Sequence, residues 1–224
     1  MNIRITVVVL TLLFLYACKK EVLCPPDTLS FLKSLPVSNK SIQKPMSADL
    51  EVSYMKSLFI VDGRGNALFV PPDTLSIEVM AEWGEVLFRL KGAGSFIEFE
   101  APMMNIKGKI NDLPDLALLG SSLWGQPMIP PDWGVRLKGI ICSNGQIVIQ
   151  DSLLAVTYDA STKEILSVAS KEGKWQMSID ERAPLDRGGL PVRLSIKSEN
   201  SGNIRIAIKG RKERSELSGA QLLK

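Results

Sequence analysis

Three cysteines are the residues of this chain whose type and position could do covalent chemistry. Cys18 follows an almost unbroken apolar run from Ile5 to Tyr16, whereas Cys24 and Cys142 lie farther along the chain. The 224 residues include no histidine, which excludes Ser-His-Asp and Cys-His nucleophiles and histidine-ligated zinc. The remaining residues show no metal-ligand spacing, so we expect no metal, no other cofactor and no enzymatic activity.

The first residues of the chain have the organisation of a secretory signal. Arg4 supplies a positive charge, and the apolar run after it is too short to cross a bilayer, which takes about 20 residues. The stretch Leu15-Tyr16-Ala17-Cys18 resembles the lipobox of bacterial lipoproteins. This resemblance implies a signal peptide over residues 1–17 and an anchor of acyl chains such as palmitate on Cys18. An ordinary signal peptide or membrane anchor with a chance cysteine is the alternative.

Residues that follow the lipobox bear on localisation and on redox state. Lys19 and Lys20 stand where an aspartate retains lipoproteins of enteric bacteria at the inner membrane, so we expect the periplasmic face of the outer membrane. In that oxidising compartment Cys24 and Cys142 could form a disulfide, or both could remain partly buried thiols. The spacing of the cysteines does not decide between these two states.

Composition divides the rest of the chain into a tether, a domain and a tail. Residues 18–45 are rich in proline, serine and lysine, and we predict a lipidated tether with a possible short helix that ends at Leu35. Residues 46–210 form one predicted domain, and residues 211–224 form a basic, solvated tail. The 27 basic and 24 acidic residues are too balanced for a nucleic-acid binder. We therefore expect a lipid or protein surface as partner.

Apolar and polar residues alternate through the predicted domain, as in strands with one buried face. The alternation marks strands near residues 50–54, 75–79, 86–90, 97–99, 147–149, 153–158, 175–179, 192–196 and 204–208. We interpret Asp62-Gly63, Gly63-Arg64-Gly65 and Gly92-Ala93-Gly94 as hairpin turns. Glu98 and Glu100 share a strand face, which we interpret as solvated rather than as an acid–base pair. The pattern predicts a mainly β, antiparallel, barrel-like sheet.

One segment, residues 113–133, is apolar without alternation. Asp112 or Asp115 could cap a short helix that ends at Gly120. This segment is interpreted either as a core-filling helix or as a movable lid over a lipid-sized cavity.

Taken in order, four stretches resemble the outer-membrane lipoprotein receptor family, LolB, and its soluble periplasmic relative LolA. They are the strands and glycine turns of residues 75–99, the proline-containing linker and helix of 126–139, the strands around Gly-x-Trp in 164–179, and the last hairpin in 190–208. The lipobox matches LolB. The resemblance implies a half-open antiparallel β-barrel with a short helical lid.

The same resemblance implies an apolar interior that receives acyl chains. The residues expected to line it or its lid are Leu50, Val52, Leu75, Ile77, Val79, Phe88, Leu116, Leu119, Leu123, Trp124, Met128, Ile129, Trp133, Met177, Leu194 and Ile206. An exposed apolar loop between early strands of LolB corresponds to Phe69 and Val70, which we expect to touch the membrane.

Two functions are consistent with these sequence features. The first is an outer-membrane-anchored monomer that accepts the acyl chains of lipid-modified proteins from a periplasmic LolA-like carrier and helps insert them in the outer membrane. The alternative is a structural or accessory lipoprotein of an envelope complex, with a packed barrel and a protein-binding apolar surface. The two differ in whether the inside of the sheet can accommodate lipid.

Overall fold

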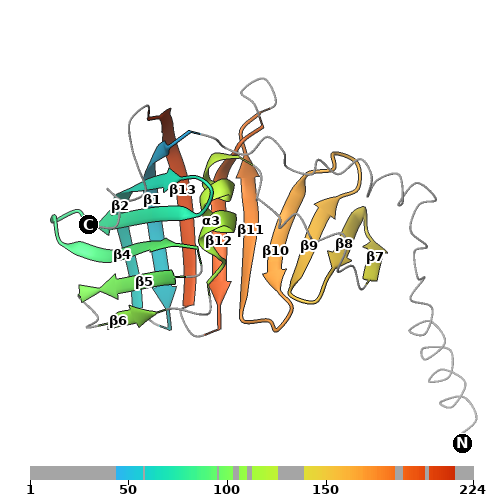
Figure 1. The fold of residues 1–224 in the computed structure, drawn as a ribbon, viewed down its shortest axis with the longest axis horizontal. Coiled ribbons are helices and arrows are strands. Elements are labelled where there is room, and N and C mark those ends of the chain that lie inside the picture. Colours follow the sequence, from blue (N-terminus) through green and yellow to red (C-terminus); the bar gives the residue numbers. More distant parts are fainter. Residues whose placement is uncertain are drawn as a thin grey trace, which may run out of the picture.

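A computed structural model describes residues 44–57, 59–94, 96–102, 106–109, 113–125, 139–184, 189–199 and 202–214. Within these ranges, thirteen strands form one antiparallel sheet, and the helix α3 (Leu116–Trp124) lies beside β12 (Figure 1). The strands are β1 (Met46–Lys56), β2 (Phe59–Val70), β3 (Thr74–Met80), β4 (Val86–Ala93), β5 (Phe96–Ala101), β6 (Ile106–Lys109), β7 (Gly139–Ser143), β8 (Gln146–Gln150), β9 (Leu154–Asp159), β10 (Ile165–Ser170), β11 (Trp175–Arg182), β12 (Pro191–Ser198) and β13 (Gly202–Glu213).

The described sheet is not closed. Its strand order is β6-β5-β4-β3-β2-β1-β13-β12-β11-β10-β9-β8-β7, so β6 and β7 are its two edges. The sheet curls, and β4 to β6 run across the direction of β1 and β13 (Figure 1). This arrangement confirms the predicted mainly β, half-open antiparallel barrel with a short helix.

The alternation of side chains gives the sheet an apolar inner face. Aligned inner-face residues form a continuous row across nine strands, from β2 to β7 through β1 and β13. The row consists of Val61, Tyr54, Ile204, Ile196, Met177, Val168, Val156, Ile149 and Ile140. Burial of such a face is the main source of stability in a sheet of this kind.

Strand β2 corrects one prediction, because it runs without interruption through the glycines that were interpreted as turns. Gly63 and Gly65 lie inside the strand, paired with β1. A Cβ atom on Gly65 would lie 2.9 Å from the Val79 Cγ2 atom and one on Gly63 2.7 Å from the Leu87 Cδ1 atom. The glycines therefore permit close packing rather than chain reversal.

The predicted turn at Gly92-Ala93-Gly94 is confirmed only at Gly94, which has a φ of 59° and follows the end of β4, whereas Gly92 and Ala93 lie in that strand. The Asn144-Gly145 pair joins β7 to β8 with φ values of 50° and 74°, the left-handed conformation that two-residue hairpins require. Trp83 and Gly84 join β3 to β4. Strand β13 continues to Glu213, so the first residues of the predicted tail belong to the sheet.

Among the described residues no helix has the length and apolar character needed to span a bilayer. The same part of the chain contains no group of three or more histidine, cysteine, aspartate or glutamate residues that could hold a metal ion.

Candidate functional site

The candidate site is the inner face of the sheet together with α3, which packs against β1, β3 and β12. The helix begins after Asp115, whose Oδ1 accepts a hydrogen bond of 2.7 Å from the Leu118 amide. This cap satisfies a backbone donor that the first turn leaves without a helical partner. The structure thus selects Asp115 from the two predicted caps. The helix continues past the predicted end at Gly120 to Trp124.

Gly120 lies inside the helix, at a point where α3 packs closely against β2. A Cβ atom at this position would lie 2.3 Å from the Phe69 Cδ2 atom of β2. The Phe69 ring stacks on Trp124, with centroids 5.7 Å apart and an interplanar angle of 17°. The Trp124 indole N–H also donates to the Ser47 carbonyl at 3.4 Å. These contacts seat the helix directly on β1 and β2.

Arg211 of β13 holds the C-terminal end of α3. Its Nε donates to the Leu123 carbonyl at 2.7 Å, and its Nη2 donates to the Pro191 carbonyl at the start of β12. A cation at a helix C-terminus interacts favourably with the helix dipole. Partial burial lowers the pKa of Arg211 from its ordinary value because desolvation disfavours the charged guanidinium. This arginine links α3, β12 and β13.

A β-bulge explains why an arginine points to the apolar side of the sheet. Leu50 pairs with Ile208 and Asp49 with Gly210, so Lys209 is an extra residue in β13. After the extra residue the alternation of β13 is reversed, and Arg211 pairs with the inward-facing Ala48. From the sequence this arginine was placed in a solvated tail, because a strict period of two cannot reveal a bulge.

The described residues that were predicted to line the cavity or its lid lie together on the inner face and on α3. All of them are buried, with exposed fractions of 9% or less. They are Leu50, Val52, Leu75, Ile77, Val79, Phe88, Leu116, Leu119, Leu123, Trp124, Met177, Leu194 and Ile206. This part of the inner face is therefore packed, and where α3 packs on β1, β3 and β12 a ligand could reach the side chains beneath it only if the helix moved away.

Other predicted site residues have different outcomes. Phe69, which was predicted to touch the membrane, is wholly buried against Trp124, so that prediction is wrong for this residue. Val70, at the end of β2, is partly buried. The predicted site residues Cys18, Cys24, Met128, Ile129 and Trp133 lie outside the described residues.

Cys142 lies in β7 with its side chain on the inner face, paired in register with Ile147. It is buried and disulfide-bonded. The chain's other cysteines, Cys18 and Cys24, are outside the described residues, so the pairing of Cys142 with Cys24 remains a prediction.

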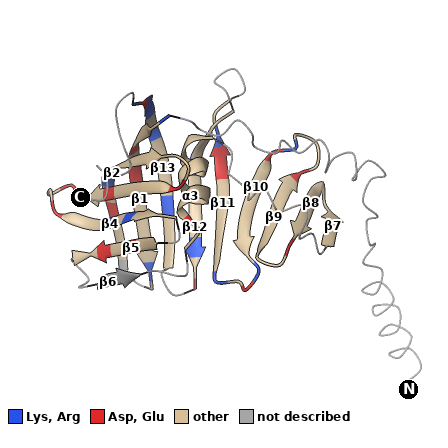
Figure 2. Ribbon diagram, viewed as in Figure 1, with Lys and Arg blue, Asp and Glu red and all other residues tan. Residues whose placement is uncertain are grey.

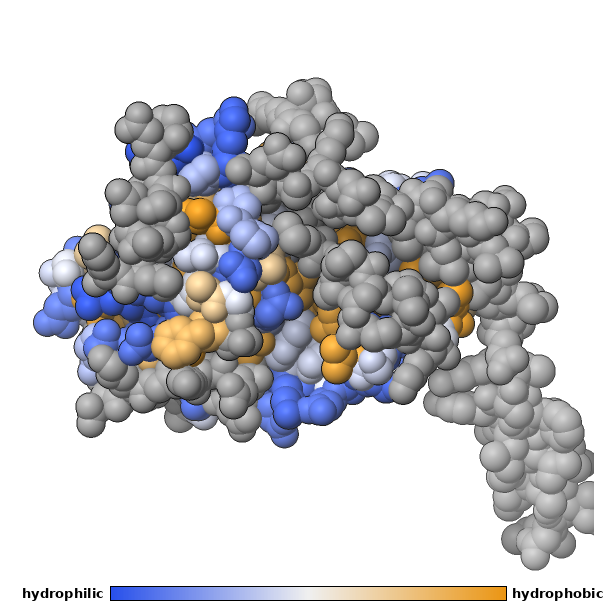
Figure 3. Space-filling model, viewed as in Figure 1, coloured by the Kyte–Doolittle hydropathy of each residue, from blue (hydrophilic) through white to orange (hydrophobic). Residues whose placement is uncertain are grey.

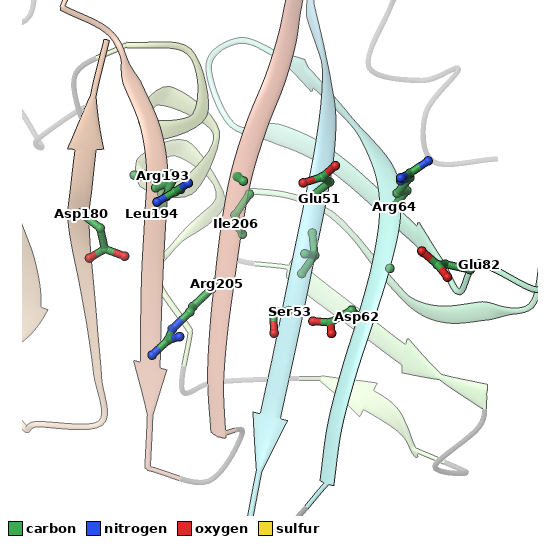
Figure 4. Close-up of a pocket in the computed structure, with 13 residues that line it drawn as sticks. Glu51, Ser53, Asp62, Arg64, Glu82, Asp180, Arg193, Leu194, Arg205 and Ile206 are labelled. Carbon is green, nitrogen blue, oxygen red and sulfur yellow. The ribbon is translucent and has the colours of Figure 1, made fainter. Parts of the chain in front are cut away.

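The outer face has a groove of about 510 Å³ that crosses β2, β1, β13 and β12 (Figure 4). Both signs of charge line it, through Glu51, Asp62, Arg64, Glu82, Asp180, Arg193 and Arg205. The Lys209 ammonium, 2.8 Å from the Glu51 carboxylate, lowers the pKa of Glu51 through their hydrogen bond. Arg193 pairs with Glu181 at 3.1 Å. The mixture of charges favours no ligand of a single sign.

Figure 3 shows hydrophobic side chains reaching the surface at the β7 end of the sheet as well as in the centre of this view. The described part of the molecule is a half-open antiparallel β-barrel with a helix packed on its apolar inner face. That arrangement defines the class of half-barrel folds in which a helix packs on the apolar, concave side of an open antiparallel sheet.

Comparison with solved structures identifies the fold as LolA-like. A LolA superfamily protein from Nitrosomonas europaea matches with a TM-score of 0.52 and 8% identity, over 88% of this chain and 97% of that chain. A DUF1329 family protein from Desulfovibrio piger ATCC 29098 matches with a TM-score of 0.51 and 8% identity, over 88% and 97% of the two chains. These likenesses concern the fold alone.

A domain from Vibrio parahaemolyticus assigned to outer membrane lipoprotein sorting is also similar, with a TM-score of 0.47 and 11% identity over 86% of this chain and 97% of that chain. No protein-family model matches the chain, and no curated protein matches its sequence. The predicted resemblance is therefore confirmed as a LolA-like fold, and the finer assignment to LolB stays a prediction.

Proposed function

We propose that this protein is a lipid-anchored protein of the bacterial envelope that binds acyl chains of lipid-modified proteins on the inner face of its half-barrel. It would receive them from a periplasmic LolA-like carrier and help insert them in the outer membrane, without catalysing a reaction. The observation that carries this proposal is the apolar inner face, continuous across nine strands in a sheet that, among the described strands, ends at β6 and β7 without closing. The LolA-like fold supports it.

Binding would require acyl chains to replace α3 on the inner face. The helix buries five large apolar side chains: Leu116, Leu118, Leu119, Leu123 and Trp124. At about 2 kcal/mol each, they contribute about 10 kcal/mol to docking of the helix. One acyl chain of about 16 carbons gains about 12 kcal/mol when it leaves water. A single chain therefore roughly offsets the displaced helix, and ligands with two or three chains exceed it.

Anchoring belongs to the same proposal. Lipidation of Cys18 with two or three acyl chains would hold the protein stably on a membrane, whereas one chain would hold it only marginally. Lys19 and Lys20 support the outer membrane as its location, on the sorting rule of enteric bacteria.

The test is displacement of a fluorescent apolar probe by diacylated and triacylated lipopeptides, using the chain without residues 1–18. Val168 is fully buried on the inner face, and its neighbour Ala169 lies on the opposite face. We expect Val168→Phe to fold and to weaken binding at least tenfold, because the added ring occupies the space of the acyl chain. The matched variant Ala169→Phe should bind as the unaltered chain does. A folded chain that binds neither probe nor lipopeptide contradicts the proposal.

The close packing of the inner face favours a second candidate function. If α3 never leaves the sheet, the protein is a structural or accessory lipoprotein that presents its surface to other envelope proteins. Val168→Phe would then overpack a solid core and lower the free energy of unfolding by about 1–3 kcal/mol. No apolar probe would bind to the unaltered chain.

A further inference from the structure

The outer face of the sheet changes character between its two halves. On β1 to β5 it carries charged pairs such as Arg89 with Glu78, at 2.5 Å. Strands β7 to β10 contain one charged residue, Asp159 at the end of β9. Figure 2 shows these strands largely free of charge along their lengths. A face of this kind suits a contact that excludes water.

A row of uncharged residues, paired from strand to strand, lies on the outer face of these strands. Ile141 of β7 pairs with Val148 of β8, Val148 with Thr157 of β9, and Thr157 with Ser167 of β10. Ile141 is 52% exposed. An edge strand normally protects itself with charge, and β7 has none.

A second exposed apolar side chain lies at the end of the same strands. Leu153, in the turn between β8 and β9, is 58% exposed. Its carbonyl accepts a hydrogen bond of 2.8 Å from the Lys171 amide, which places the β10–β11 turn beside it. That turn carries Lys171 and Lys174, of which Lys174 pairs with Glu172 at 2.5 Å, so the turn has one net positive charge. Apolar tips next to lysines are the pattern of surfaces that insert shallowly between anionic headgroups.

The disulfide of Cys142 connects this end of the sheet to the membrane anchor. This step rests on the proposed function, in which the Cys18 sulfur forms a thioether to diacylglycerol. A thioether leaves no thiol for a disulfide, so Cys24 is the remaining partner for Cys142 among the three cysteines of the chain.

The length of the tether sets the distance between this edge and the bilayer. The six residues from Cys18 to Cys24 span at most about 20 Å. Without the disulfide, the sheet would hang from Met46 of β1, and the intervening residues could extend about 95 Å. Strands β1 and β7 are seven neighbours apart in the sheet, about 34 Å along a flat sheet. The disulfide therefore moves the point at which the tether holds the sheet from its middle to its β7 edge. It also shortens the chain between the lipid anchor and the sheet several-fold.

We propose that the β7 edge and the adjoining outer face of β7 to β10 lie on the membrane surface, with Ile141 and Leu153 in contact with lipid. A Cys24–Cys142 disulfide, attached on the inner side of the edge strand β7, would keep this edge close to the bilayer. In this orientation the β7 end of the described sheet lies directly over the bilayer. Cargo on the inner face would leave along that edge without crossing water.

Photocrosslinking of the full lipidated chain in membrane vesicles tests the orientation. A benzophenone amino acid replaces Ile141 or Leu153, and in matched controls it replaces Ile60 or Trp83, each 63% exposed in the β1–β4 half. We expect phospholipid adducts at positions 141 and 153 in several-fold excess over positions 60 and 83. Equal adducts at all four positions overturn the proposal. Adducts to protein instead of lipid at 141 and 153 also overturn it and indicate a protein interface.

The disulfide is tested on the same material. Tryptic digestion without reduction should yield peptide 21–33 joined to peptide 139–163, and Cys142→Ser should lower the adducts at position 141 to the level of the controls. A free Cys24 thiol overturns the proposal. If the chain washes off the vesicles and lacks lipid on Cys18, the proposed function itself fails. A lipidated, membrane-bound chain with equal adducts refutes the orientation alone.

Discussion

Replacement of Arg211 by methionine should loosen α3 without unfolding the sheet. The substitution keeps much of the side-chain volume and removes the donors that reach the Leu123 and Pro191 carbonyls. It also removes the positive charge from the C-terminal end of the helix. Because α3 packs on the inner face at β1, β3 and β12, its docking equilibrium governs access to that part of the face.

The expected size of the effect follows from these interactions. Hydrogen bonds from a charged donor contribute about 1.5–3 kcal/mol each, and a cation at a helix C-terminus about 0.3–1 kcal/mol. Part of this loss in docking free energy is offset, because methionine carries no charge and so removes the cost of desolvating the Arg211 guanidinium, the cost that lowers its pKa. We expect a net loss of about 2 kcal/mol, which corresponds to about a 30-fold shift toward undocked helix.

Amide hydrogen exchange measured on peptides reports this equilibrium directly. Peptides that cover α3 should lose about 30-fold in protection in Arg211→Met, whereas those from β2 and β3 should change little. Arg205→Met is the control, since this arginine lies on the outer face of the same strand. Equal loss of protection in α3 and the strands would show that Arg211 stabilises the whole fold rather than the helix, and the prediction would be wrong. Unchanged or increased protection would mean that desolvation outweighs the hydrogen bonds.

Three further predictions concern stability. Gly120→Ala should lower the free energy of unfolding by about 1–3 kcal/mol, because the added methyl group meets the Phe69 ring. Gly125→Ala should change it little, because the added methyl group would lie 4.0 Å from its nearest neighbour, the Ser121 carbonyl oxygen. Equal losses for the two variants in denaturant titrations would contradict this prediction. Hydrogen bonds from Ser161 and Thr162 lower the pKa of Asp159 from 3.8 to about 2. Its carboxylate therefore stabilises the folded chain fully above pH 3.8, and this stabilisation is lost as the pH falls through about 2. Asp159→Ala should therefore melt below the unaltered chain at pH 7, by a margin that disappears toward pH 2. Burial raises the pKa of Tyr158 well above 10, so melting temperatures should fall as the pH rises past 10, and Tyr158→Phe should fall less; identical curves would show that this ring does not titrate on unfolding.

Alternation along the chain was enough to predict most of the sheet, because burial of one face imposes a period of two on the sequence. It failed at two kinds of position, at glycines inside a regularly paired strand and at a β-bulge. Gly63 and Gly65 resemble turn residues, yet they serve the close approach of Val79 and Leu87 to β2. The bulge at Lys209 reversed the orientation of Arg211. Neither feature has a local sequence signal, since each depends on a neighbouring strand.

The residues of the candidate site could be predicted from the sequence, but whether they line a cavity or form a packed core could not. Apolar residues assigned to a cavity do lie together, because inward alternation places them on one face. The same residues would show the same pattern in a solid core, so only the structure shows that α3 packs against them. Phe69 was misplaced for a related reason: its exposure depends on the stacking of Trp124, which lies 55 positions away in the sequence.

The pairing of β1 with β13 has a consequence for the order in which the molecule can fold. Every other neighbouring pair in the described sheet joins consecutive strands, so β1–β6 and β7–β13 are two local meanders. Such hairpins form quickly, whereas contacts between distant segments are slow. Strand β13 is synthesised last among the described strands, and it carries both the pairing with β1 and the arginine that binds α3. The two halves can therefore join only when translation of this strand is complete, and until then the apolar inner faces of the two meanders lack the pairing that brings them together.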